Sequence, residues 1–444
     1  MDYKLKLDFS NMLQANPTIE EEIRNARPKL AVAAEEVLAK KDAGLLGFFN
    51  LPYMKEDALG IRELAGYIKN NYKNMVVIGI GGSALGNRLL HGALNHPYYN
   101  KLSDSERKGC PRVFVLDSID SDQLQGLFDI LDLRETVFNV ITKSGTTVET
   151  MANFLVIKDM LEREVGEQRA KESIIATTDA SRGSLLEIAR QEGYRLLFIP
   201  ENVGGRYSVL SAVGLLSAAV SGIDNEELLS GAAYIAKACT GEDPYKNQAL
   251  LGAALQYVAY GMGKSISVVM PYSDALYYFG DWYCQLWAES LGKTVSTGDT
   301  VMQVGQTPLK AIGVRDQHSL LQLFLDGPDD KVFTLIEVDE RKSSFVIPAA
   351  GQAGRDLEYL SGSTLEKLLK SEFKATGSVL TGRGRLNYKI SLAEISPYTI
   401  GQLIFHYMLM TAYMGELLGV NAFDQPAVEE GKRITYRLMG RRGY

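Results

Sequence analysis

Short apolar runs alternate with longer amphipathic stretches over much of this chain. The apolar runs of the first half cover residues 75–80, 112–116, 136–142, 173–177 and 195–199. Runs of this length predict buried strands, and helix-length sequence separates each run from the next. The alternation predicts a parallel sheet with helices on both faces, which is an α/β fold.

A second set of elements follows the first. We predict helices at 247–262, 276–290 and 398–418, and strands at 265–270 and 332–338. The first 62 residues are predicted to be helical, because 19–43 is rich in the good helix formers Glu, Ala, Lys and Leu. The expected organisation is a helical segment (1–62), two αβα domains (63–225 and 240–420) and a C-terminal tail (421–444).

Composition places the chain among ordinary globular proteins. It has 444 residues, 46% hydrophobic and 23% charged, with a net charge of −7. The acidic balance argues against nucleic acid as a partner. The Ser and Gly residues within 208–223 favour a buried helix over a membrane span, and 1–10 lacks the apolar region of a signal peptide. Three widely spaced cysteines suggest neither disulfides nor a metal site, so we expect a cytoplasmic location.

A glycine-rich turn, Gly79-Ile-Gly-Gly-Ser-Ala-Leu-Gly86, lies between a predicted strand and a helix. Such a turn brings backbone N–H groups close to a phosphate at the helix N-terminus. Three interpretations are open: a dinucleotide site with Asp117 on the ribose, a site for another phosphate, and a structural turn. The spacing to Asp117 is longer than the usual ~20 residues of dinucleotide folds.

Hydroxyl side chains cluster at the end of the third predicted strand, in Thr142-Lys-Ser-Gly-Thr-Thr-Val-Glu-Thr150. Hydroxyls and free amides at a helix start suit a phosphate monoester. A capping box, such as Thr146 with Glu149, would explain one hydroxyl but not five in nine residues. A dinucleotide fold does not need this second cluster, so the segment favours a phosphorylated small molecule.

These two segments resemble the phosphate-binding motifs of sugar isomerase (SIS) domains. Asn202-Val-Gly-Gly-Arg-Tyr-Ser208 and Phe423-Asp-Gln-Pro-Ala-Val-Glu-Glu-Gly-Lys432 resemble two signatures of the glucose-6-phosphate isomerase family. Ala427 stands where that family commonly has Gly, a difference that concerns only the local backbone angle. The resemblance implies two SIS-type αβα domains, a homodimer, and reversible aldose–ketose isomerisation of glucose 6-phosphate and fructose 6-phosphate in glycolysis and gluconeogenesis.

The resemblance also implies a role for each matching residue. Glu289 would be the base that moves a proton between C2 and C1, and Arg206 would hold the enediolate oxygens. His318, contributed by the partner subunit, and Lys432 would open the sugar ring. Substrate binding would fall to Gly82, Ser83, Thr142, Lys143, Ser144, Thr147, Gln285 and Gln425. Lys143 would donate through its side chain or through its backbone N–H alone.

Two other functions stay open at this point. A non-catalytic SIS-type sugar-phosphate sensor would keep Ser83 and the hydroxyl cluster but would not need Glu289, Arg206 and Lys432. A nicotinamide-dependent dehydrogenase would use the glycine turn for its cofactor. The preferred enzyme needs no cofactor, and the sequence offers no dense His, Asp or Glu cluster for a metal ion. Its expected partners are a sugar phosphate and a second copy of the chain, with neither nucleic acid nor membrane.

Overall fold

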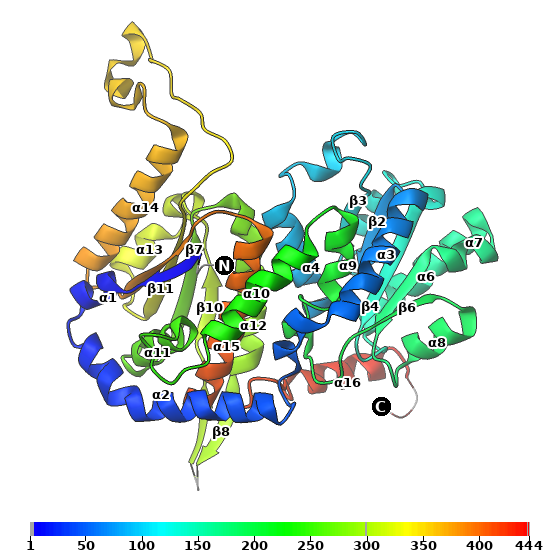
Figure 1. Ribbon diagram of the computed structural model, residues 1–444, viewed down its shortest axis with the longest axis horizontal. Coiled ribbons are helices and arrows are strands. Elements are labelled where there is room, and N and C mark those ends of the chain that lie inside the picture. The colour runs from blue at the N-terminus through cyan, green and yellow to red at the C-terminus, as the bar shows by residue number, and fades with distance from the viewer. Residues whose placement is uncertain (1–3, 298–299, 442, 444) are drawn as a thin grey trace.

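Two β-sheets lie side by side along the long axis of the molecule, each covered by helices (Figure 1). The computed structural model describes residues 4–297, 300–441 and 443. The first sheet has the strand order β3-β2-β4-β5-β6, and all of its neighbouring strands are parallel. Its strands are β2 (Asn74–Ile78), β3 (Arg112–Leu116), β4 (Thr136–Thr142), β5 (Ile174–Thr178) and β6 (Arg195–Phe198). All five runs predicted as strands are therefore confirmed.

The second sheet has the order β1-β12-β11-β7-β10. It contains the predicted strands β7 (Ile266–Pro271) and β11 (Lys331–Val338), together with β10 (Thr307–Lys310) and β12 (Asn387–Leu392), which the sequence pattern did not reveal. The edge strand β1 (Leu5–Asp8) runs antiparallel to β12, whereas the other pairs are parallel. The prediction of helices alone before Arg62 is thus wrong at Leu5–Asp8. A separate hairpin is formed by β8 (Lys293–Thr297) and β9 (Thr300–Val304).

Helices cover both faces of each sheet. The helices of the described residues are α1 (Ser10–Ala15), α2 (Ile19–Asp42), α3 (Lys55–Asn71), α4 (Gly82–Leu94), α5 (Ser121–Phe128), α6 (Val148–Val165), α7 (Glu167–Glu172), α8 (Ser184–Glu192), α9 (Ala212–Val220), α10 (Asn225–Ala238), α11 (Gln248–Gly261), α12 (Tyr277–Leu291), α13 (Leu321–Asp326), α14 (Leu365–Gly382), α15 (Pro397–Leu418) and α16 (Val428–Leu438), the last of which has no buried residue. None of the helices in the described part of the chain is long and apolar enough to cross a membrane.

Alternate residues of each strand face different hydrophobic cores, as a sheet between two helical layers requires. In β2, Val76 and Ile78 pack with α6 and α8 on one face, while Met75 and Val77 face α3, α4 and α9. The core that contains Met75 and Val77 continues without a break into α11, α12 and α15, beside the second sheet. One apolar cluster therefore joins the two halves and fixes how α4 lies against α12.

The chain passes from the first sheet to the second between α9 and α10. Helix α10 packs along α15, and α2 packs on α11 and α15. The N-terminal segment is therefore part of the second half of the molecule through β1 and α2. In the sequence, residues 63–225 lie between this segment and the rest of that half. These contacts support the proposed division into two domains near residues 225–240.

His406 lies inside α15 with none of its surface exposed. Neither ring nitrogen has a hydrogen-bond partner among the described residues. Burial lowers the pKa of His406 to about 3, because the charged imidazolium would lose its hydration without gaining a partner. The ring is therefore neutral in the folded protein.

This buried histidine predicts a loss of stability in mild acid. Below about pH 6.5 the histidine binds a proton in the unfolded chain but not in the folded protein. The free energy of unfolding therefore falls by up to about 1.4 kcal/mol per pH unit as the pH is lowered. In urea denaturation at pH 7.5 and pH 5.0, His406→Met should shrink the difference between the two pH values by about 2 kcal/mol. His96→Gln, at an exposed histidine, is the control and should leave the difference unchanged. An unaltered difference in His406→Met would contradict the explanation.

Candidate active site

The glycine turn brings three segments into contact. Gly81 has φ +56°, and a Cβ atom on it would lie 2.8 Å from Gln285 Nε2. A Cβ atom on Gly82 would lie 2.2 Å from the carbonyl group of Gly205. Only glycine fits at these positions, so the N-terminus of α4 meets both η5 (Gly205–Tyr207) and α12. The half-buried Ser83 lies in the first turn of α4, where backbone N–H groups point out of the helix.

The predicted hydroxyl cluster forms at the end of β4. Thr142 Oγ1 lies 2.8 Å from Thr147 Oγ1, and Ser144 Oγ lies 3.4 Å from each of these atoms. Thr147 is the residue before α6, yet its side chain makes no capping hydrogen bond. The alternative capping box of Thr146 with Glu149 is therefore not formed. Three hydroxyls converge at a helix N-terminus, an arrangement that can bind the oxygens of a phosphate.

The Lys143 side chain is engaged elsewhere. Its Nζ donates to the carbonyl oxygens of Glu201 at 2.6 Å and Val203 at 2.9 Å. Burial lowers the pKa of Lys143, and the nearby acidic residues only partly oppose this. Its ammonium group therefore ties the hydroxyl cluster to the loop before η5, and these two bonds use two of its three N–H donors.

Arg206 lies in η5 and connects both halves of the molecule with the C-terminal loop. Its side chain is only 2% exposed. The five N–H donors of the guanidinium match five acceptors. The acceptors are Ser290 Oγ (2.7 Å), Glu289 Oε2 (3.2 Å), Gln425 Oε1 (2.8 Å), Ala422 O (2.8 Å) and Asp424 O (3.0 Å). This guanidinium therefore fixes the end of α12 against residues 422–425.

Glu289 and Gln285 lie one turn apart on the same face of α12, as the sequence spacing predicts. Gln285 Nε2 donates to Glu289 Oε1 at 3.0 Å, while Gln285 Oε1 is buried and has no partner among the described residues. The Glu289 side chain is 35% exposed, so its carboxylate reaches solvent between Arg206 and Gln285. Lys293 does not neutralise this carboxylate, because its Nζ bonds to the backbone oxygen of Glu289.

His318 lies at the opposite end of α12 from Glu289. It is exposed in η7 (Arg315–His318), and Arg315 Nη2 pairs at 2.7 Å with Asp274, just before the first residue of α12. Glu289 follows Tyr277, the first residue of that helix, by twelve residues, which corresponds to about 18 Å of helix. Within one chain, the predicted histidine and the predicted base are not brought together.

Lys432 is also separate from the carboxylate. It lies on α16, a helix with no buried residue, and pairs with Glu429 at 2.6 Å. The same C-terminal segment does bring Gln425 to Arg206. The structure therefore unites Glu289, Arg206, Gln285 and Gln425 but leaves His318 and Lys432 outside this group.

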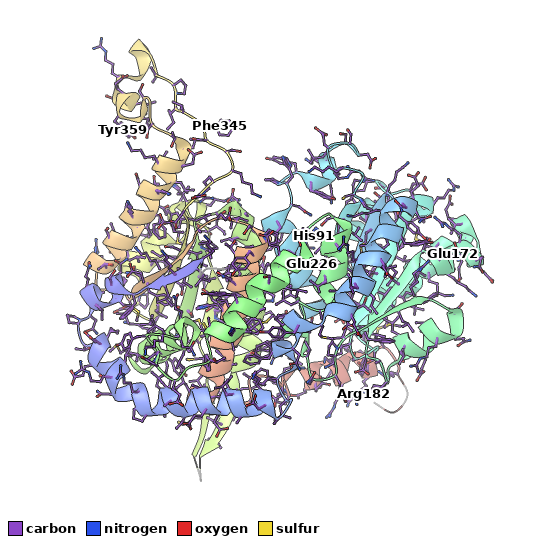
Figure 2. All side chains as sticks on the ribbon, in the orientation of Figure 1. His91, Glu172, Arg182, Glu226, Phe345 and Tyr359 are labelled. Carbon is purple, nitrogen blue, oxygen red and sulfur yellow. The ribbon has the colours of Figure 1, made fainter. Side chains whose placement is uncertain are left out.

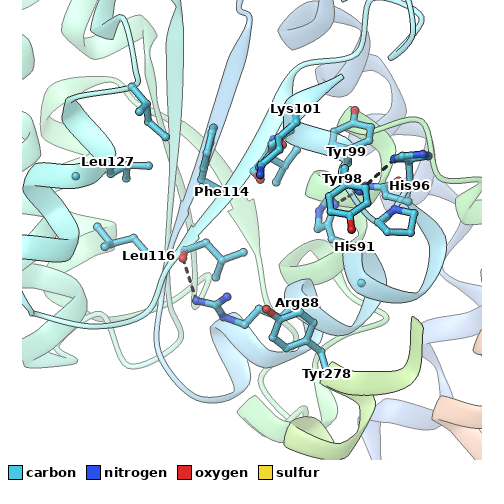
Figure 3. Close-up of a pocket in the computed structure, with 18 of the residues that line it drawn as sticks. Arg88, His91, His96, Tyr98, Tyr99, Lys101, Phe114, Leu116, Leu127 and Tyr278 are labelled. Carbon is cyan, nitrogen blue, oxygen red and sulfur yellow. Dashed lines mark hydrogen bonds between the residues drawn. The ribbon is translucent and has the colours of Figure 1, made fainter. Parts of the chain in front are cut away.

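A cavity of about 520 Å³ lies at the other end of the α4–α12 contact (Figure 3). Arg88 and Tyr278 line one side of it, and no carboxylate is among its lining residues. Arg88 Nε and Nη2 hold both oxygens of Asp117, at 2.6 and 2.7 Å. Asp117 is thus already engaged, which argues against its predicted alternative role as a ribose ligand. Among residues 4–297, 300–441 and 443, no three His, Cys, Asp or Glu side chains gather as a metal site.

Sequence reasoning missed two residues that organise this site. Ser290 accepts a hydrogen bond from Arg206, and Lys293 bonds to backbone oxygens of α12 and of the C-terminal loop. The spacing of Lys293, four residues after Glu289, was a signal for a cation at the helix end. Apart from Gln425, the hydrogen-bond acceptors in the C-terminal loop are the backbone carbonyls of Ala422 and Asp424, which no sequence signal could have identified.

The sequence of the chain is similar to those of known proteins. The profile of the family described as phosphoglucose isomerase matches residues 54–441. The chain is 44% identical to glucose-6-phosphate isomerase of Carboxydothermus hydrogenoformans, over 99% of this chain and 96% of the relative. It is 42% identical to that of Rubrobacter xylanophilus, over 98% of each chain.

Solved structures are similar as well. The crystal structure of a hypothetical protein of Thermus thermophilus has a TM-score of 0.88 and 35% identity, covering 98% of this chain and 100% of that one. A glucose-6-phosphate isomerase of Chlamydia trachomatis has a TM-score of 0.75 and 25% identity, covering 87% of this chain and 73% of that one. The arrangement of two sheets is therefore shared with an isomerase of known structure.

The close contact between Gly82 and the Gly205 backbone predicts that a single methyl group added at position 82 lowers the stability of the protein. In Gly82→Ala the new Cβ would overlap the Gly205 backbone, so the strand-turn-helix must shift, at a cost of about 1–3 kcal/mol in unfolding free energy. Gly60→Ala is the matched control, because Gly60 is an exposed residue of α3 with open space around it, and should gain roughly 0.5–1 kcal/mol. Thermal unfolding measures both variants, and a shift of the same sign in the two would refute the contact.

Proposed function

The chain belongs to the phosphoglucose isomerase family, and on this premise we propose that it interconverts glucose 6-phosphate and fructose 6-phosphate. The observation that carries the proposal is a partly exposed carboxylate, Glu289, held between Arg206 and Gln285, with Gln285 against a glycine turn that adjoins the end of β4. We propose that the reaction serves glycolysis and gluconeogenesis in the cytoplasm.

The substrate phosphate binds at the two helix N-termini of the first sheet. Ser83 belongs to the first turn of α4, and Thr142, Ser144 and Thr147 surround the start of α6. Hydroxyls, backbone N–H groups and the helix dipoles all favour an anion here. The backbone N–H of Lys143 joins them, while two of its three ammonium donors bond to carbonyl oxygens of the loop before η5. The phosphate acts as a handle whose binding energy orients the reacting carbons against Glu289.

Glu289 transfers the proton between the two carbons. In the open-chain aldose it removes the hydrogen of C2, which leaves an enediolate, and it returns that proton to C1 while the hydroxyl proton passes to the other oxygen. The reaction is an internal redox exchange, so no external oxidant or reductant is needed. Only the ionised carboxylate accepts a proton, and Glu289 Oε2 lies 3.2 Å from Nη1 of Arg206.

Arg206 stabilises the negative charge of the enediolate. Its Nη1 donates to two side chains, Glu289 and Gln425, whereas its other donors hold Ser290 and two backbone carbonyls. We propose that substrate oxygens replace one of the two Nη1 contacts. A cation fixed in advance beside a developing oxyanion costs no reorganisation when the charge appears.

Ring opening requires groups that reach the site from elsewhere. Lys432 would act at the ring oxygen once α16 moves toward Glu289, and the exposed surface of this helix supports such mobility. His318 would come from the partner subunit. Its position near the other end of α12 supports this, because Arg315 of the same η7 segment pairs with Asp274, far from Glu289 of the same chain.

A projecting arm (residues 339–364) supports the dimer. It extends from the second sheet between β11 and α14, and Phe345 and Tyr359 lie on it, away from the body of the molecule (Figures 1 and 2). Their exposures are 65% and 78%. Apolar side chains on an extended arm indicate a surface that another protein covers.

The assignment of the base predicts a selective loss of turnover. Glu289→Gln keeps the size of the side chain but cannot accept the proton, so kcat should fall by ~10²–10⁴-fold or more with little change in KM. Glu63→Gln, at an exposed residue of α3, is the control for the same replacement. A coupled assay on fructose 6-phosphate measures both, and wild-type turnover in Glu289→Gln would rule out this base.

The shared site predicts complementation between two inactive proteins. When Glu289→Gln and His318→Ala subunits are mixed and exchange, a heterodimer has one site with both lesions and one with neither. Random exchange of equal amounts gives about half heterodimers, so recovery should approach a quarter of the wild-type activity.

Exchange must be verified by native mass spectrometry, because unexchanged dimers also give no recovery. If exchange is complete and activity does not return, His318 acts within its own chain or not at all. That outcome would leave the role of Glu289 intact.

A further inference from the structure

The end of α12, which carries Glu289, lacks the usual helix C-cap. The helix ends at Leu291, and the following Gly292 is extended (φ −73°, ψ 94°) rather than left-handed. The last carbonyl groups of a helix have no partners inside it, and a left-handed cap would normally supply them. The carbonyls next to the base therefore need a donor from elsewhere.

Lys293 supplies that donor. Its Nζ donates to Glu289 O at 2.5 Å and to Ser290 O at 3.1 Å. A cation at the C-terminus of a helix also interacts favourably with the helix dipole. The backbone of the proposed base is thus held by the ammonium group four residues later, while its carboxylate stays available.

The same ammonium group reaches the C-terminal loop. Lys293 Nζ donates to Asp424 O at 3.0 Å and lies 3.7 Å from Asp424 Oδ1. Asp424 O also accepts a hydrogen bond from Arg206. Two cations, one from each half of the molecule, therefore share a carbonyl oxygen in the loop that carries Gln425.

We propose that Lys293 is a positioning residue of the isomerase, which fixes Glu289 and Gln425 relative to each other by bridging the end of α12 to the C-terminal loop. It acts through these two residues and does not touch the substrate. Misplacement of a reacting group by about 1 Å can cost 10²-fold in rate, so a bridge of this kind controls kcat. The inference rests on the proposed roles of Glu289 and Gln425.

Lys264 is a matched control for Lys293. Its side chain is 9% exposed, compared with 10% for Lys293, and it also bonds to a backbone oxygen and a carboxylate of one residue, Asp329, at 2.8 and 2.7 Å. It lies before β7, at the end of the second sheet opposite to the carboxyl ends of the strands. Lys264→Met should therefore lower stability in a similar way without affecting the site.

The first test compares Lys293→Met, Lys293→Arg and Lys264→Met. In Lys293→Met, kcat for fructose 6-phosphate should fall about ten- to a hundredfold, with an unchanged inhibition constant for inorganic phosphate, which probes the hydroxyl cluster alone. Lys293→Arg should recover most of kcat, and Lys264→Met should keep all of it. Equal kcat in Lys293→Met and wild type, or equal losses in both Met variants at the same folded fraction, would overturn the proposal.

A double-mutant cycle separates positioning from a general structural role. If Lys293 acts by holding the loop, Gln425→Ala should lower kcat much less in the Lys293→Met background than in the wild-type background. Additive losses would overturn the proposal. Should Lys293→Met fail to fold, Lys293→Gln replaces it throughout with the same expectations.

The outcome for Glu289→Gln distinguishes a failure of the proposed role of Lys293 from a failure of the proposed role of Glu289. If Glu289→Gln is inactive while Lys293→Met keeps full activity, only the role of Lys293 is wrong. If Glu289→Gln is active, the base itself is misassigned and the proposal for Lys293 falls with it.

Discussion

The buried guanidinium of Arg206 is the interaction on which the rest of the site depends. A cation removed from water costs several kcal/mol unless hydrogen bonds replace its hydration. Its acceptors come from α12 and from the C-terminal loop, while Arg206 itself belongs to the segment after the first sheet. All five donors are satisfied only when these three parts of the chain are in place, so the site and the assembled fold are formed together.

Close packing of the backbone leaves little freedom in how the start of α4 lies against Gly205 and α12. Gly82 lets the start of α4 contact the Gly205 backbone directly, and the neighbouring Gly81 faces Gln285. The apolar cluster shared by both halves keeps α4 and α12 at this distance. The glycine turn, which is the proposed phosphate site, and the proposed base are therefore held at a fixed distance, which suits chemistry that requires a fixed separation between phosphate and reacting carbons.

Under the proposed function, one group of site residues is assembled within the chain, and a second group has to come from elsewhere. Hydrogen bonds link Glu289 with Arg206 and Gln285, and other hydrogen bonds hold the side chains of the hydroxyl cluster together. His318 and Lys432 are exposed and lie on segments that have other neighbours. Under the proposed function, proton transfer depends on the first group, whereas ring opening depends on subunit assembly and on movement of α16.

The sequence by itself determined the elements whose signals are local. Strands β2 to β6, the glycine turn and the Thr142–Thr147 hydroxyl cluster follow from apolar runs and from the residues next to them. Strand β1 escaped prediction because its four residues are stabilised by β12, almost 400 positions away, and its own pattern is too short to stand out. Only the tertiary structure decided that Ser290, Lys293 and the Asp424 carbonyl surround Glu289 and Arg206, since backbone acceptors carry no side-chain signature and contacts between distant segments depend on how the two sheets pack.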